Sequence, residues 1–275
     1  YVTSGVAHLI VRCVGDQERH LDLIAAARER LLAESDVLLA TSAHSPHGAT
    51  EGYPVAPREA LAHGVVVLAT DDTSMNLITA SIAGGFVGAG AAVGVMMITK
   101  DTTAFIGNGA TVDADGHDAG FATALNGAIG TDAHAKAVFG RTTAHGLTVL
   151  AESKEDILQL TIAGAGGFVG VGGAVGVTLV DSDTHAFIGQ NAAINQTAGN
   201  AGADAQQTVF VNAANDVNAF VIGGGVGGGF VGVGGAVSVG NINNDVGATI
   251  QSGANVAARL DVSVDAVAIK KLEGY

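Results

Sequence analysis

Three segments of the chain alternate between β-branched and very small residues, and they dominate its hydrophobic pattern. They span residues 86–98, 168–180 and 230–240. In the second segment, valine or leucine fills most odd-numbered positions, whereas glycine, alanine or threonine fills most even-numbered ones. Because successive side chains of a β-strand point to opposite faces, this period of two predicts a strand in each segment. Valine packs well in strands, so we predict that the valine face points inward.

The small residues of these strands form their second face. In the second and third segments, its members are Gly170, Gly172, Ala174, Gly176, Gly232, Gly234 and Ala236. A face without bulky side chains can be approached closely by another sheet or another chain. We predict that this glycine and alanine face mediates self-association. Flat strands and solenoid ends also favour end-to-end pairing, which would build filaments or fibres.

Each alternating segment lies inside a longer block that occurs three times. The blocks begin at Val67, Val149 and Val209, and a partial copy begins at Leu31. Within the first block, equivalent apolar residues recur at a step of 19, as from Val67 to Phe86. A β-solenoid needs such a step, because each rung buries its apolar face only by stacking on its neighbours. The pattern predicts an all-β, parallel β-solenoid with about ten rungs of about 20 residues each.

The repeats divide the chain into five parts. Residues 1–64 form a degenerate repeat or cap with a proline-containing insertion, and residues 113–146 form a second insertion. The repeat modules span 65–112, 147–206 and 207–275. We predict that both insertions leave the solenoid as loops.

Two uncharged runs permit a different interpretation, as transmembrane helices. Residues 77–99 and 157–180 are long enough to span a bilayer and contain GxxxG spacings. Each glycine, however, destabilises a helix by about 1 kcal/mol relative to alanine, and acidic rather than basic residues dominate the flanks. Strands therefore remain the preferred prediction. Residues 20–34 fit either a helix or a strand. The spacing of their apolar residues favours a helix, whereas their likeness to the repeat start favours a strand.

Composition favours flat β layers over an ordinary globular core. Glycine supplies 41 of 275 residues, aromatic residues make up 4%, and tryptophan is absent. Such small residues suit closely stacked strands.

The net charge of −14 argues against binding nucleic acids or anionic lipid. The single cysteine, Cys13, has no second thiol for an internal disulfide, and we expect it to be a small buried residue.

One acidic segment is a candidate for calcium binding. The sequence VDADGHDAG places Asp113, Asp115 and Asp118 around Gly116, and oxygen ligands at this density suit calcium. An EF-hand loop would need an acidic residue at its twelfth position, where this chain has Ala124. A solvated turn is therefore the preferred interpretation, and we predict no other cofactor.

The sequence does not predict enzymatic activity. Spacings such as Gly88, Gly90 and Gly94 match a phosphate loop only in their glycines, because they lie in alternating segments with no amphipathic helix after them. A carbohydrate-acting β-helix enzyme would need carboxylates with basic partners on one face, and the 12 lysines and arginines are thinly spread. We expect a protein that is not an enzyme.

The block IAGGFVGxGxAVGV, followed by DTxAFIGxxAxV, resembles the repeat regions of large bacterial exoproteins of the filamentous-haemagglutinin and leukotoxin-like type. The resemblance covers residues 65–112 and 147–269. It implies export through the outer membrane, a right-handed β-helix, and a role at the cell surface in adhesion or toxicity. We therefore expect an extracellular or surface-bound structural and interaction segment, with other copies, surface proteins or glycans as partners. The alternatives are a membrane-active toxin segment and a carbohydrate-acting β-helix enzyme.

Overall fold

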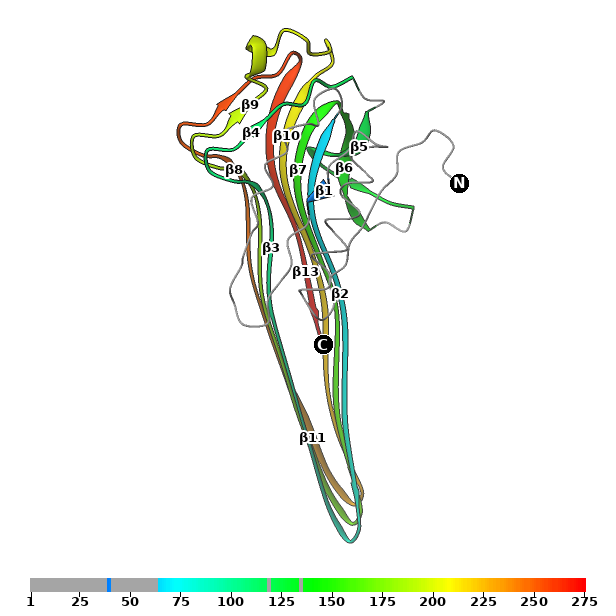
Figure 1. The fold of residues 1–275 in the computed structure, drawn as a ribbon. Helices are drawn as coiled ribbons and strands as arrows, with labels where there is room; N and C mark the ends of the chain where they lie inside the picture. The colour runs from blue at the N-terminus through cyan, green and yellow to red at the C-terminus, as the bar shows by residue number, and fades with distance from the viewer. Residues whose placement is uncertain (1–38, 41–63, 118–119, 134–135) are drawn as a thin grey trace, which may run out of the picture.

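The computed structural model describes residues 39–40, 64–117, 120–133 and 136–275 (Figure 1). The predictions for Cys13, for residues 20–34 and for the proline-containing insertion therefore lie outside the described residues. Apart from one 3-10 helix, all of the described elements are strands. They are β1 (Leu39–Ala40), β2 (Val65–Gly84), β3 (Val87–Ile106), β4 (Thr111–Val112), β5 (Phe121–Thr131), β6 (Ala137–Ala144), β7 (Gly146–Gly166), β8 (Val169–Ile188), β9 (Ala193–Ile194), the 3-10 helix η1 (Thr197–Asn200), β10 (Thr208–Gly228), β11 (Val231–Ile250), β12 (Asn255–Val256) and β13 (Asp261–Gly274).

Apart from β5 and β6, the strands stack in parallel and in register in three sheets. Sheet A has the order β1-β2-β7-β10-β13, sheet B the order β3-β8-β11, and sheet C the order β4-β9-β12. One coil of the chain supplies a long strand to sheet A, a long strand to sheet B and a short strand to sheet C. The predicted all-β, parallel β-solenoid is confirmed, and the three alternating segments lie in β3, β8 and β11.

The predicted rung length of about 20 residues is wrong. In sheet A, Leu147 pairs with Val65 on one side and with Val209 on the other, so that the partners differ by 82 and 62 residues in number. The step of 19 residues measures instead the length of one strand, because each long strand runs the whole length of the molecule before the chain turns. The described residues therefore form three complete coils, followed by β13, and not about ten short rungs.

The insertion at 113–146 is not simply a loop. It contains β5 and β6, which pair as an antiparallel hairpin. Leu125 of this hairpin is fully buried and packs with Leu150 and Ala214 of sheet A. Arg141 of the hairpin donates two hydrogen bonds to the carboxylate of Glu152, at 2.6 and 2.8 Å. The hairpin thus leaves the solenoid, as predicted, but it folds back onto the outer side of sheet A.

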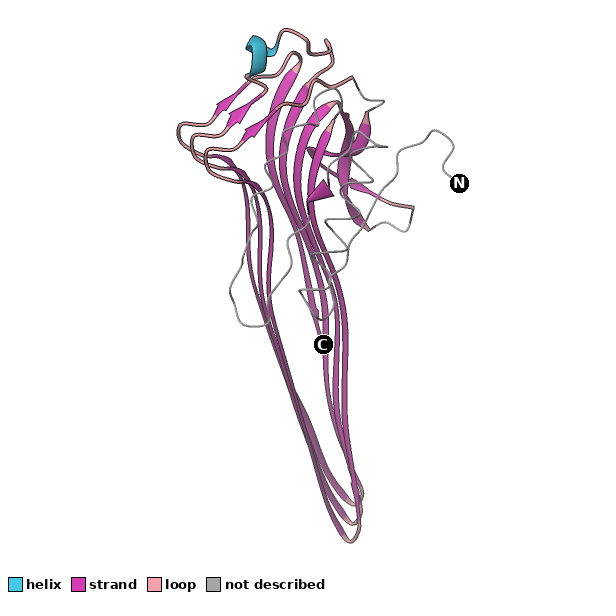
Figure 2. Cartoon of the chain, in the orientation of Figure 1, coloured by secondary structure: helices cyan, strands magenta, loops and turns pink. Residues whose placement is uncertain are grey.

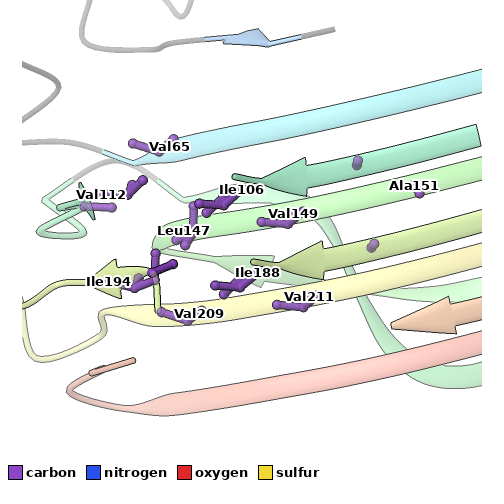
Figure 3. Close-up of a cluster of buried hydrophobic side chains, with 14 of the residues drawn as sticks. Val65, Ile106, Val112, Leu147, Val149, Ala151, Ile188, Ile194, Val209 and Val211 are labelled. Carbon is purple, nitrogen blue, oxygen red and sulfur yellow. The ribbon is translucent and has the colours of Figure 1, made fainter. Parts of the chain in front are cut away.

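One end of the molecule, which we call the base, has three sides because sheet C lies between the ends of sheets A and B (Figure 2). Its interior holds fully buried aliphatic side chains from all three sheets, among them Leu147, Val149, Ile188, Ile194 and Val209 (Figure 3). Burial of each such side chain contributes about 1.5–3 kcal/mol. The base is therefore a conventional hydrophobic core.

A layer of polar side chains lies between sheets A and B beyond the base. Its centre is Glu155, which is fully buried, with the Lys100 Nζ atom 2.9 Å from Oε1. The same carboxylate accepts hydrogen bonds from Ser153 at 2.7 Å, Ser182 at 3.0 Å and Asn215 at 3.1 Å. These residues come from all three coils. Their pairing therefore ties neighbouring coils together in one register.

Beyond this layer, sheets A and B continue alone as a narrow two-layered structure, which we call the blade (Figure 2). It comprises residues 75–98, 157–180 and 219–242, which pair in register and include no charged residue. At its far end, two residues connect each strand of sheet A to the next strand of sheet B. The first of the two is a glycine with positive φ, as at Gly167 (φ 156°), where a Cβ atom would lie only 1.9 Å from the Gly85 oxygen. Both the backbone conformation and the stacking therefore require glycine at this turn.

Candidate functional site: the apolar blade

The interior of the blade consists of the glycine and alanine face that the sequence suggested for self-association. A Cβ atom at Gly170 would lie 2.5 Å from the Gly228 oxygen, and one at Gly234 would lie 2.3 Å from the Gly225 oxygen. Ala236 likewise faces Gly223 of the opposite sheet. These residues therefore contact the other sheet of their own chain. The remaining members of the predicted face lie on the same inward side of β8 and β11, namely Gly172, Ala174, Gly176 and Gly232.

The valine side chains of the blade point outward, so the predicted orientation of both faces is wrong. Val175, in the central strand of sheet B, is 40% exposed between Val93 and Val237, which are more exposed still. The physical reason is the two-residue turn at the end of the blade. It brings sheets A and B so close that only small residues fit between them, and the larger residue of each alternating pair must face outward.

The outer side of sheet A is also apolar within the blade. Ile78 and Val226 are largely exposed, and Ile82 is 92% exposed. Ile162 lies in the central strand of this sheet and is 39% exposed. Apolar side chains thus cover both broad faces of the blade.

A ladder of three aromatic rings closes the tip. Phe86, Phe168 and Phe230 follow the three turn glycines, and their ring centroids are 5.2 Å apart in both stacked pairs. The ring planes are nearly parallel, with interplanar angles of 3° and 7°, and the three residues are 78%, 50% and 82% exposed. Stacked aromatic rings are typical of hydrophobic contact surfaces. The tip therefore adds an aromatic edge to the two apolar faces.

The apolar outer surface of the blade is larger than solvation alone would favour. Three strands about 4.8 Å apart, each contributing about 11 residues at about 3.3 Å, give about 500 Å² on the outer face of sheet B alone. The largest apolar patch on a typical monomeric protein is about 300–600 Å² in total. Together with sheet A and the tip, the blade exceeds this range, which is typical of an interaction site.

Acidic residues mark the boundary of the blade on sheet B. Asp101, Asp183 and Asp245 are register partners in adjacent strands. Burial raises the pKa of Asp183, and the negative charges of Asp181, Asp245 and Asp101 raise it further, against a lowering effect of His185. Like charges directly opposite one another across strands are destabilising. The three aspartates therefore repel one another in the ionised state.

Sheet A has charged residues of both signs at its boundary with the blade. Lys154 lies 3.4 Å from the Asp156 carboxylate, and Asn218 donates a hydrogen bond to it at 3.2 Å. Burial raises the pKa of Asp156, but the hydrogen bond from Asn218 and the charge of Lys154 outweigh this effect, so its pKa is lowered overall. The pKa of Asp156 is thus shifted in the opposite direction to that of Asp183, whereas burial raises the pKa of the neighbouring Asp216.

Two of the three candidate calcium ligands are described, and both take part in hydrogen bonds. Asp113 accepts hydrogen bonds from both the backbone N–H and the hydroxyl of Thr197, at the start of η1. The carbonyl of Asp115 accepts a hydrogen bond from the Asp204 N–H at 2.8 Å, and Asp118 lies outside the described residues. Among the residues that the structure describes, no group of three or more His, Cys, Asp or Glu side chains is placed to hold a metal ion. The calcium site stays a prediction.

The runs 77–99 and 157–180 are not helices but strand–turn–strand units, β2 with β3 and β7 with β8. Within the described part of the chain, no helix has the length and apolar character to cross a membrane. Comparison with protein-family models, with curated proteins and with solved structures finds no match to this chain. Its functional interpretation therefore rests on the geometry of the blade and on the resemblance of its repeat block.

Proposed function

We propose that this chain is a structural and surface-interaction segment of a secreted or cell-surface bacterial protein, and that it engages its partners through the blade. The observation that carries the proposal is the exposed apolar surface of the blade, with the Phe86, Phe168 and Phe230 ladder at its tip. The bacterial and extracellular setting comes from the resemblance of the repeat block to exoproteins of the filamentous-haemagglutinin type.

The architecture suits the presentation of a surface over a distance. Strands of 20 residues at about 3.3 Å per residue extend about 65 Å from the far end of the base to the tip. Each central strand is hydrogen-bonded along its length to both neighbours, which makes the blade stiff. A solvated protein of this size gains nothing from exposing valine and phenylalanine on every side of a projecting end, whereas a protein that binds there gains contact area.

Attachment of beads that carry the purified chain to cultured epithelial cells tests this proposal. Phe168→Ser removes the central ring of the tip ladder. Phe187→Ser is the matched control, since Phe187 of β8 stacks on Phe105 of β3 at 5.1 Å in sheet B, at the base and away from the tip. We expect several-fold fewer attached beads with Phe168→Ser and no change with Phe187→Ser. Wild-type beads that attach no better than uncoated beads would refute the proposal.

One observation favours a membrane-active segment as the second candidate. The uncharged part of each blade strand has about 12 residues, or about 40 Å, which exceeds the roughly 30 Å hydrocarbon core of a bilayer. Leakage of dye from phosphatidylcholine vesicles distinguishes the two functions. Strong leakage at low protein concentration would favour the membrane-active function, whereas cell attachment without leakage would favour the interaction segment.

A further inference from the structure

We propose that the outer face of sheet B within the blade is a self-association face, on which a second copy of this chain packs face to face. This inference rests on the proposed function, because it takes the blade to be the interaction surface. The face has two neighbouring ridges of valine, one in each of two register rows: Val93, Val175 and Val237, and Val95, Val177 and Val239. We call it the valine face.

A groove of small residues runs beside the first ridge. It is formed by Ala91, Gly173 and Gly235, which are register partners two positions along the strands. A Cβ atom at Gly173 or Gly235 would meet no atom within 4 Å, so contacts inside the chain do not require glycine at either position. Glycine within a strand is destabilising by roughly 0.5–1 kcal/mol relative to alanine. Room for a second copy gives these outward glycines a physical role.

The ridge and the groove are complementary under a twofold rotation. If two copies pack with their blades antiparallel, about an axis at the level of Ala92 and Ala174, the ridge of each copy enters the groove of the other. The same rotation places the second valine ridge over the row of Ala89, Val171 and Val233. Such an isologous contact, in which both copies use the same patch, is the commonest arrangement of homodimers.

The charges fit the antiparallel arrangement. Overlap of residues 87–97 of the two copies leaves the ladder of Asp101, Asp183 and Asp245 beyond the tip of the partner, in solvent. A parallel arrangement would bring the two aspartate ladders against each other, and like charges in contact are unfavourable. The antiparallel overlap buries about 500 Å² of projected area on each copy, about 1,000 Å² in total, which is the lower limit for a specific interface.

Sheet B suits a flat partner better than sheet A does. Its valine rows have valine in every coil, so that each ridge is even. The outer rows of sheet A change in size between coils, as in the register row of Ile82, Gly164 and Val226. A ridge of side chains of equal size packs more readily between the side chains of a second sheet.

A second copy also fits the valine face better than a bilayer does. Within the described residues, β3 and β11 are the edge strands of sheet B, and their unpaired backbone groups lie along the blade. Each backbone group left unpaired in hydrocarbon costs several kcal/mol, so open sheet edges are excluded from the bilayer core. In a face-to-face dimer, these edges stay in water.

Sedimentation velocity over a series of concentrations tests the inference with two matched variants. Val175→Lys places a charge at the centre of the valine face. Ile162→Lys places the same charge at the centre of the outer face of sheet A, and the two residues are 40% and 39% exposed. We expect a dimer of the wild-type chain, a dissociation constant raised at least tenfold by Val175→Lys, and a change of less than about twofold with Ile162→Lys.

Circular dichroism checks that both variants keep the β spectrum, and Val175→Thr is the milder variant if Val175→Lys does not fold. A monomeric wild-type chain at its highest soluble concentration would overturn the inference, and so would equal weakening by both lysines. Flotation with phosphatidylcholine vesicles tests lipid as the alternative occupant. If lipid surrounds the blade, either lysine should reduce flotation to the same extent. Beads that attach to cells although the chain is monomeric would refute this inference alone, whereas failed attachment refutes the proposed function.

Discussion

The base and the blade are made from the same strands, yet they have opposite interiors. In the base, Leu147 and Val149 of β7 point inward, and sheet C holds sheets A and B apart around them. In the blade, Gly170 points inward and Val175 points outward, because a two-residue turn draws the two sheets together. The spacing of the layers, and not the hydrophobicity of a residue, therefore decides which face of an alternating strand is buried.

Substitution in the polar layer between these two regions should lower the free energy of unfolding the most. Lys100→Met would leave the Glu155 carboxylate buried without its cation, and removal of one partner from a buried ion pair costs about 3–5 kcal/mol. We expect a loss of this size in the free energy of unfolding, measured by urea denaturation. The double variant Lys100→Met/Glu155→Gln removes the unpaired charge and should recover most of the loss. A double variant no more stable than the single one would contradict this role of Lys100.

In the base, removal of a large side chain should be costly. Leu147 is fully buried in the core, so Leu147→Ala should lower the free energy of unfolding by about 2–5 kcal/mol through lost burial and a cavity. Val237→Ala, on the outer face of the blade, should change it by less than about 0.5 kcal/mol. Urea denaturation at a concentration where the chain is monomeric measures both. Equal losses would mean that the outer valines are as well packed as the core.

In the blade, addition of a side chain should be costly on the inside only. Gly170→Val forces a Cβ atom to within 2.5 Å of the Gly228 oxygen, and overpacking of this kind costs about 1–3 kcal/mol. Gly173→Val is the same change in the same strand on the outer face, where no atom lies within 4 Å, and it should be neutral or stabilising by up to about 1 kcal/mol. Thermal unfolding of the two variants, at a concentration where the chain is monomeric, compares them. A stable Gly170→Val variant would show that the sheets can separate at little cost.

The sequence alone predicted the strands and their parallel stacking, because both follow from local alternation and from a repeat. It did not predict the length of a coil. The step of 19 from Val67 to Phe86 is the distance from base to tip within one strand, and the same step would arise from short rungs. Only the pairing of Leu147 with Val65 and Val209 distinguishes the two, and this pairing is a long-range property.

The candidate site was missed because alternation does not say which face is inside. The useful signal was present at the turns, where two glycines precede Phe86, Phe168 and Phe230 in all three blocks. Such a turn connects two strands through two residues, and the layers that it joins must lie close together. Together with the alternation, this turn favours small residues on the inside and valine on the outside.

The smallest changes in stability are expected for two aspartates at the boundary of the blade, Asp183 in sheet B and Asp156 in sheet A. Because the pKa of Asp183 is raised in the folded state, its ionisation opposes folding, and the stability it gives at low pH is lost as the pH rises through its folded pKa. Asp183→Asn should therefore stabilise the protein at pH 7 by about 0.5 kcal/mol and have no such effect below the unfolded pKa of about 3.9. Asp156 has a lowered pKa, so its ionised form favours folding, and this contribution is lost as the pH falls. Asp156→Asn should accordingly destabilise the protein at pH 7 by about 0.5 kcal/mol. Thermal unfolding of both variants at pH 7 and pH 3 measures the two effects, and variants that shift in the same direction at pH 7 would show that the two aspartates do not differ electrostatically.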